Sequence, residues 1–247
     1  MFFGVTYNAA SSIATTVNGL VKGLVNNVIQ AFRPAIIKSY AAEDMHSVQR
    51  YIEDAITFML LLYGCLFTPF FIEMPYLIEL WLSMVPYSAV TFCRLLLIAS
   101  VVSMISNVIT ILIHATGKIK ALSFVSGSIY LLALPIIYLF YVKNNLVDDA
   151  YYILIITNVL ICVSNTIILN RLVPTINIAH LIMSIIKSVL IVMLASFPTI
   201  LLFVNMNSSI MRLFSVSMVQ LICIVFIVYS FVLDKATRKK IKQMIWL

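Results

Sequence analysis

The chain is a succession of long apolar segments separated by short polar connections. A membrane-spanning helix needs roughly 20 mostly apolar residues. Seven stretches meet this requirement: Asn8–Ile37, Tyr51–Ile72, Tyr87–Ala115, Ile119–Val142, Ala150–Ile168, Leu181–Val204 and Met211–Leu233. No connection is long enough to fold separately. The sequence therefore predicts an all-α integral membrane protein in which residues 1–247 form a single transmembrane domain of about seven helices.

The composition excludes several other classes of protein. Hydrophobic residues make up 63% of the chain and charged residues 10%, whereas an ordinary soluble domain is about half apolar and about a quarter charged. A soluble enzyme, a disordered chain and a small secreted domain are therefore excluded. The net charge is +7. In a chain this apolar, we interpret the excess of basic residues as a signal for orientation in the bilayer, and we expect no nucleic-acid partner.

The distribution of Lys and Arg predicts the orientation, because these residues accumulate on the cytoplasmic side. With the C-terminus inside, the cytoplasmic charges are Arg33, Lys38, Arg50, Lys118, Lys120, Arg171, Lys235, Arg238, Lys239, Lys240 and Lys242. Few basic residues then lie outside. We predict an external N-terminus and a cytoplasmic basic tail, residues 234–247, lying against membrane lipids. Lys187, Arg212 and the outer aromatics Tyr141 and Tyr151 are interpreted as interfacial anchors.

The first segment carries a polar stripe. Its members are Asn8, Ser11, Thr15, Asn18, Lys22, Asn26, Gln30 and Arg33. Every step between them is three or four residues, so on a helix they share one face. Unpaired polar groups in hydrocarbon are costly. The stripe is therefore expected to face a water-filled cavity or a partner helix.

Cationic side chains are the most informative members of this pattern. A lysine in mid-membrane, such as Lys22, usually faces a cavity or pairs with a carboxylate, and both interpretations stay open. For Arg94, snorkelling to the surface competes with a cavity role. Arg33 serves either as a topology anchor or as a contact for an anionic head group. The candidate substrate cavity consists of Asn18, Lys22, Asn26, Gln30, Arg33 and Arg94.

Other polar residues inside the segments have simpler interpretations. Asn158, Asn165 and Gln220 are expected to form interhelical hydrogen bonds. Glu53 and Asp54 are expected to complement the positive N-terminus of the second helix, with a coupling-ion site as the alternative. The sequence contains no metal-ligand spacing, glycine-rich phosphate loop or nucleophile beside a base. We expect no enzyme activity and no cofactor.

Several short motifs resemble one transporter family. They are Asn8–Ala14, Val17–Gly19, Arg33–Asp44, Leu80–Leu82 followed by Val85 and Pro86, Phe92–Leu95 and Gly117–Lys120. Together they resemble the Wzx-type polysaccharide flippases of the superfamily that contains the MATE exporters. The versions encoded with lipopolysaccharide, O-antigen and capsule genes are the most similar. The last three segments contribute no motif to this resemblance and match the family only in their hydropathy.

The resemblance implies a fold of about fourteen helices in two lobes around a central cavity. Such proteins carry an undecaprenyl-diphosphate-linked oligosaccharide across the bacterial cytoplasmic (inner) membrane by alternating access. Seven segments that begin outside correspond to the second half of that fold. We therefore expect the chain to be the C-terminal part of a longer flippase whose N-terminal half is a partner.

Three alternatives remain at this stage. A MATE-type cation-coupled exporter of small molecules would need carboxylates in the cavity, and the segments carry none at mid-span. A membrane enzyme such as a glycan polymerase would need a substantial outer loop. A fragment that transports nothing is the third alternative.

Overall fold

The computed structural model describes residues 4–82, 86, 88–144 and 146–232, and within them the only regular elements are helices. Their bounds are α1 (Val5–Ala41), α2 (Met45–Ile72), α3 (Met74–Trp81), α4 (Ala89–Ala115), α5 (Lys120–Asn144), α6 (Asp149–Leu172), α7 (Ile178–Asn205), α8 (Ile210–Ile227) and the π-helical turn η1 (Val228–Val232). The predicted fold class is confirmed. The short helix α3 was not foreseen, because the sequence analysis treated that stretch as a connection.

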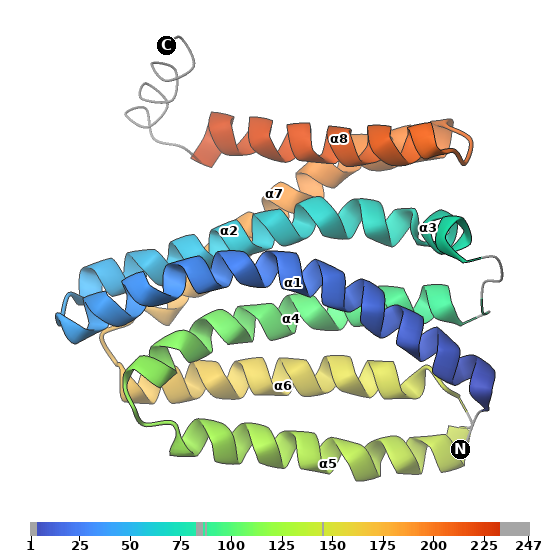
Figure 1. The fold of residues 1–247 in the computed structure, drawn as a ribbon. Helices are drawn as coiled ribbons and strands as arrows, with labels where there is room; N and C mark the ends of the chain where they lie inside the picture. The colour runs from blue at the N-terminus through green and yellow to red at the C-terminus, as the bar shows by residue number, and fades with distance from the viewer. Residues whose placement is uncertain (1–3, 83–85, 87, 145, 233–247) are drawn as a thin grey trace.

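Within the described residues, six helices, α2 and α4 to α8, are long and apolar enough to cross a membrane. The protein is therefore a multi-pass membrane protein. Helix α1 is more polar, yet its 37 residues extend about 55 Å at 1.5 Å per residue, well over the roughly 30 Å of a hydrocarbon core. It packs between α2 and α4 and runs beside them (Figure 1).

Local side chains set several helix starts. The Asp44 carboxylate accepts a hydrogen bond from the Ser47 N–H at 3.1 Å and so caps α2. This bond lowers the pKa of Asp44. Asn177 and Ser209 cap α7 and α8 in the same way. Because α2 begins at Met45, Glu53 and Asp54 lie beyond its first turn. The prediction that they complement this helix N-terminus is therefore wrong.

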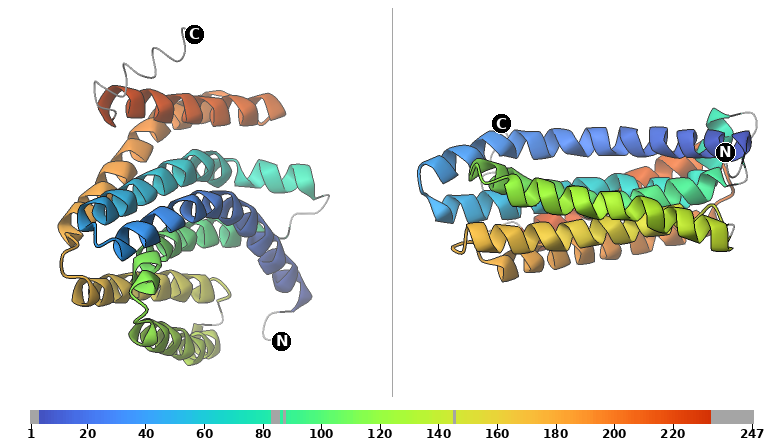
Figure 2. Two further views of the ribbon diagram at one scale, coloured as in Figure 1. Left: turned by 60° about the vertical axis from the view of Figure 1, so that its left-hand side comes forward. Right: turned by 90° about the horizontal axis from the view of Figure 1, so that it is seen from below.

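The helices form a row. Helices α4, α6 and α5 follow α1 on one side, and α2, α7 and α8 follow it on the other (Figures 1 and 2). The main hydrophobic core lies among α1, α2, α4 and the inner face of α6. Large apolar side chains of α5, α7 and α8 are exposed, including Leu131, Leu134, Phe197, Phe214 and Phe226. These exposed faces suit contact with lipid tails.

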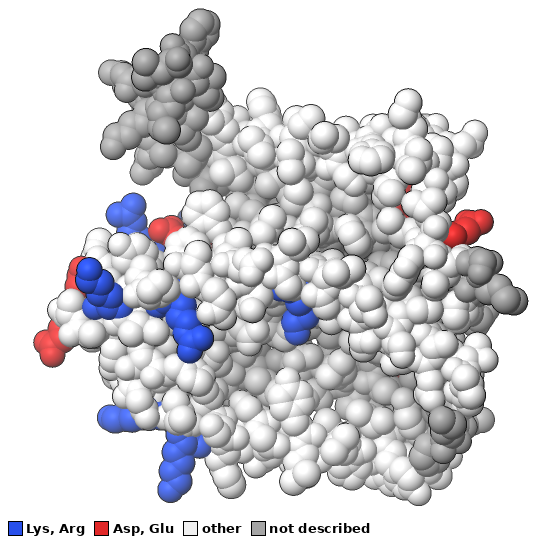
Figure 3. Space-filling model, viewed as in Figure 1, with Lys and Arg blue, Asp and Glu red and all other residues white. Residues whose placement is uncertain are grey.

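Basic residues gather at the end of the bundle that contains the α1–α2 connection (Figure 3). The helix bounds bring Lys38, Arg50, Lys118, Lys120 and Arg171 to this end. The opposite end contains the acidic residues Glu73, Glu79, Asp148 and Asp149. We call the two ends the basic end and the acidic end. The connections whose charges were used to predict the orientation therefore lie alternately at the two ends of the bundle, as expected. The predicted basic tail, 234–247, lies outside the described residues.

Candidate functional site

The polar stripe of α1 borders the face that packs into the core. Small and β-branched residues form the buried face: Ala10, Ala14, Val17, Val21, Val25 and Ile29. Their small size lets α1 approach α4 closely. The polar residues lie one position away around the helix, along the edge of this contact. The stripe is therefore a continuous border to the packed core.

Asn18 joins this border to the neighbouring helix. Its side-chain oxygen accepts a hydrogen bond from the Ser100 hydroxyl of α4 at 2.5 Å. One turn further along, Lys22 is half-buried, while Asn26 and Gln30 are exposed. The stripe thus becomes more exposed as it approaches the basic end.

Lys22 is the cation near the middle of α1. Within the described part of the chain, no ion pair or hydrogen bond engages its ammonium group. One of the two interpretations of Lys22, pairing with a carboxylate, is therefore not seen among these residues. Arg33, near the basic end, is exposed like Asn26 and Gln30. The structure brings Asn18, Lys22, Asn26, Gln30 and Arg33 together along one side of α1.

Arg94 lies apart from this group. Its Nε donates to the Phe71 carbonyl oxygen at 2.9 Å, and its guanidinium lies 5.3 Å from the centroid of the Phe71 ring. That carbonyl is among the last of α2, where a cation is favoured. Arg94 is about 200° around α4 from Phe92, which faces α1 and α6. It therefore binds the end of α2 and does not join the stripe.

The other half of the stripe opens onto a cleft. Asn8, Ser11 and Thr15 line a space of about 460 Å³ together with residues of α4, α5 and α6. The Tyr151 hydroxyl of α6 donates to the Ser11 hydroxyl at 3.1 Å, and the Tyr151 ring stacks on Phe92 with centroids 4.4 Å apart. Sequence analysis missed this cleft because Tyr151 was interpreted as an interfacial anchor.

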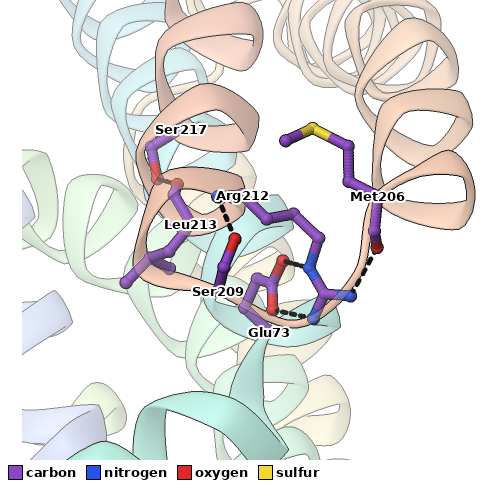
Figure 4. Close-up of polar contacts among 6 residues, drawn as sticks. All are labelled: Glu73, Met206, Ser209, Arg212, Leu213 and Ser217. Carbon is purple, nitrogen blue, oxygen red and sulfur yellow. Dashed lines mark hydrogen bonds and ion pairs between the residues drawn. The ribbon is translucent and has the colours of Figure 1, made fainter.

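A buried ion pair connects two segments that are far apart in the sequence, at the acidic end of the bundle (Figure 4). Arg212 donates from Nε and Nη2 to the two carboxylate oxygens of Glu73, each at 2.7 Å. A further nitrogen of Arg212 donates to the Met206 carbonyl at 3.0 Å. Both side chains are almost wholly buried, so the prediction that Arg212 anchors at the interface is wrong. The pair joins α8 to the end of α2.

The polar residues expected to join helices do so. The Asn165 amide donates to the Ser106 hydroxyl at 2.8 Å, connecting α6 to α4. Asn158 accepts from Tyr130 of α5 at 3.4 Å. Gln220 of α8 accepts from Thr199 at 2.8 Å and donates to Thr68 at 3.3 Å. These predictions of interhelical hydrogen bonds are confirmed.

Glu53 and Asp54 line a space between α2 and α7 that also contains Lys187 and Ser188. Glu53 accepts a hydrogen bond from Gln49 at 2.5 Å, and its carboxylate lies 3.9 Å from Nδ1 of His180. A carboxylate oxygen of Asp54 lies 3.9 Å from Nε of Arg50, so both acidic residues have partners in their own surroundings. Among the described residues, no group of three or more His, Cys, Asp or Glu side chains is placed to hold a metal ion.

Comparison of the chain with protein-family models, with curated proteins and with solved structures gives no match. The functional conclusion therefore depends on the residues and on their arrangement.

Proposed function

We propose that the chain belongs to a transporter that moves a lipid-linked oligosaccharide across a membrane. The single observation that supports the proposal most is the open polar side of α1, with a lysine in its middle that no described residue engages. A buried helix in a closed bundle would pair such groups, because unpaired polar groups in hydrocarbon are costly. This side of α1 therefore suits a water-filled path.

The residues on this path match the chemistry of the proposed substrate. Phosphate groups favour Lys and Arg, which Lys22 and Arg33 supply. Sugars need hydrogen-bonding groups, which Asn18, Asn26 and Gln30 supply. The lipid tail of the substrate would remain in the bilayer beside the exposed apolar faces of the bundle. An undecaprenyl-diphosphate-linked oligosaccharide combines these three parts.

The proposal includes a setting. We place the protein in the bacterial cytoplasmic membrane, with the basic end of the bundle inside and the N-terminus outside, and we assign it to lipopolysaccharide or capsular polysaccharide synthesis. A second helical lobe, the N-terminal half expected from the resemblance, would face the polar side of α1 and complete the cavity. The charge distribution and the motifs of the sequence support this setting.

Substitution of Lys22 tests the proposal. The gene that encodes this chain is introduced into a flippase-deficient strain, and Lys22→Ala should lower surface glycan about tenfold or more. The reason is that the variant loses a hydrogen bond between a charged group and the substrate, and such a bond contributes about 1.5–3 kcal/mol. Lys22→Arg should retain most of the export. Lys187→Ala is the matched control, since it removes an exposed lysine of α7 from outside the stripe.

Export and membrane levels are measured together. Wild-type surface glycan from Lys22→Ala at an equal membrane level would contradict the proposed role of Lys22. Rescue of drug resistance in place of surface glycan would favour the exporter of small molecules. An equal loss from Lys187→Ala would show that the effect comes from lost charge in general.

A further inference from the structure

The cleft at the acidic end of the bundle has a chemistry different from that of the lysine-containing part of the stripe. Its lining residues come from the beginning of α1, the end of α5, the beginning of α6 and from α4, and the first three of these segments lie at the same end of the bundle (Figure 1). Its volume of about 460 Å³ falls in the range of roughly 300–1,000 Å³ that is usual for small-molecule sites. None of its lining residues carries a charge.

Aromatic rings, aliphatic side chains and hydrogen-bonding groups together form the walls. Tyr7, Tyr141, Tyr151 and Phe92 provide rings, and the polar groups are Asn8, Ser11, Thr15 and the tyrosine hydroxyls. Contact with both Phe92 and Ser11 holds the Tyr151 ring in place. A fixed aromatic surface with nearby amide and hydroxyl groups complements a sugar ring, which has an apolar C–H face and hydroxyl groups at its edge.

Charge around the cleft favours a neutral ligand over an anionic one. No lysine or arginine lines it. Asp148 and Asp149, which come between the lining residues Val147 and Ala150, outnumber Lys143, which comes two positions after the lining residue Tyr141. A negative ligand would meet electrostatic repulsion there. The diphosphate of a lipid-linked glycan would consequently not bind in this cleft.

We propose that this cleft binds an uncharged sugar ring, and that it holds part of the glycan while the diphosphate lies near Lys22. The assignment of the bound sugar to a transported glycan rests on the proposed function. Ser11 and Lys22 are eleven residues apart on one helix, which is about 16 Å along its axis. The two positions therefore contact different sections of an elongated substrate.

Saturation-transfer difference NMR on the purified chain tests this site directly. The detergent must have no sugar head group, because such a head group would compete. The probes are glucose, galactose, N-acetylglucosamine and, as the charged comparison, glucuronate. We expect saturation of the ring C–H protons of at least one neutral sugar, and binding of glucuronate at least several-fold weaker.

Two variants locate the binding. Asn8→Ala, at an exposed position, should weaken binding of the neutral sugar about threefold to tenfold through loss of one hydrogen bond. Tyr151→Leu removes both the ring and the hydroxyl and should abolish binding, with circular dichroism as the check on folding. If Tyr151→Leu does not fold, the exposed Asn8→Ala still decides the outcome. Lys187→Ala, at an exposed position of α7 outside the cleft lining, should bind the sugars as the wild type does.

Several results would overturn the sugar site: no saturation of any neutral sugar, wild-type binding by Asn8→Ala, or glucuronate bound as tightly as glucose. The proposed function is judged separately by export from Lys22→Ala. Normal export from Lys22→Ala combined with loss of sugar binding in Asn8→Ala would leave the sugar site standing and remove the assigned role of Lys22. Lost export from Lys22→Ala, combined with no binding of any neutral sugar by the wild type, would support the role of Lys22 and remove the sugar site.

Discussion

Removal of the Glu73 carboxylate should be among the most damaging single changes in this protein. In Glu73→Ala the Arg212 guanidinium remains buried and loses its two hydrogen bonds of 2.7 Å. Each such bond to a charged group contributes about 1.5–3 kcal/mol. Breaking a buried pair on one side costs about 3–5 kcal/mol overall, because it leaves a desolvated charge. We expect a loss of about this size in the free energy of unfolding.

The structure separates this effect from helix capping. Glu73 is also the residue before α3, yet its side chain makes no capping hydrogen bond there. The loss from Glu73→Ala therefore reports the ion pair. The double variant Glu73→Leu/Arg212→Met should recover much of the stability, since replacing both partners with apolar residues removes the stranded charge.

The assay is reversible unfolding of the purified chain by SDS in mixed micelles, monitored by circular dichroism. Arg50→Ala is the matched control, because Arg50 pairs with Asp54 at 3.9 Å with side chains 76% and 46% exposed. Exposed pairs contribute below about 1 kcal/mol. A loss from Glu73→Ala no larger than that from Arg50→Ala would refute the reasoning.

Two further predictions concern packing and pH. Gly64→Ala should destabilise the protein by about 1–3 kcal/mol in the same unfolding assay, because the new methyl group would overlap the Val192 side chain of α7. Gly23→Ala, which meets open space, should show no loss, and equal losses from both would contradict this packing argument. The hydrogen bond from Ser47 lowers the pKa of Asp44 below its ordinary value of 3.8. The stabilisation by Asp44 should therefore be complete above that value and decline as the pH falls through the lowered pKa. Thermal unfolding measured between pH 2 and 6 should show this decline in the wild type. Asp44→Asn keeps a capping side chain that does not titrate, so its stability should lack the decline that Asp44 causes. Identical pH profiles of the two proteins would contradict the prediction.

The long helices could be predicted from the sequence because each depends on a local property. Runs of about 20 apolar residues form helices in a bilayer whatever their neighbours are, since the backbone must satisfy its own hydrogen bonds there. The helix that contains Lys22 was predicted from the length of its segment, and its polar face from three-and-four spacing; the helix is present as α1. The short helix α3 was missed because the apolar run that predicted α2 ends at Ile72, and the 8 residues of α3 are too few to be recognised as a membrane-spanning segment.

The candidate site was predicted only in part. Asn18, Lys22, Asn26, Gln30 and Arg33 share a side of one helix, and a single helical period is enough to predict that. Arg94 is on another helix, so its direction depends on how α4 is rotated against α2. That rotation sets Arg94 on the Phe71 carbonyl, and spacing within one segment contains no information about it.

The order of residues alone predicts the membrane class, the number of long helices, and the one helix that carries a polar stripe. Periodicity and hydropathy are properties of neighbouring residues, and they act before any two helices meet. The tertiary structure decided which distant groups meet: Glu73 with Arg212, Gln220 with Thr199, and Tyr151 with Ser11. These contacts join residues on different helices, and only the packing of the helices determines which of them come within hydrogen-bonding distance.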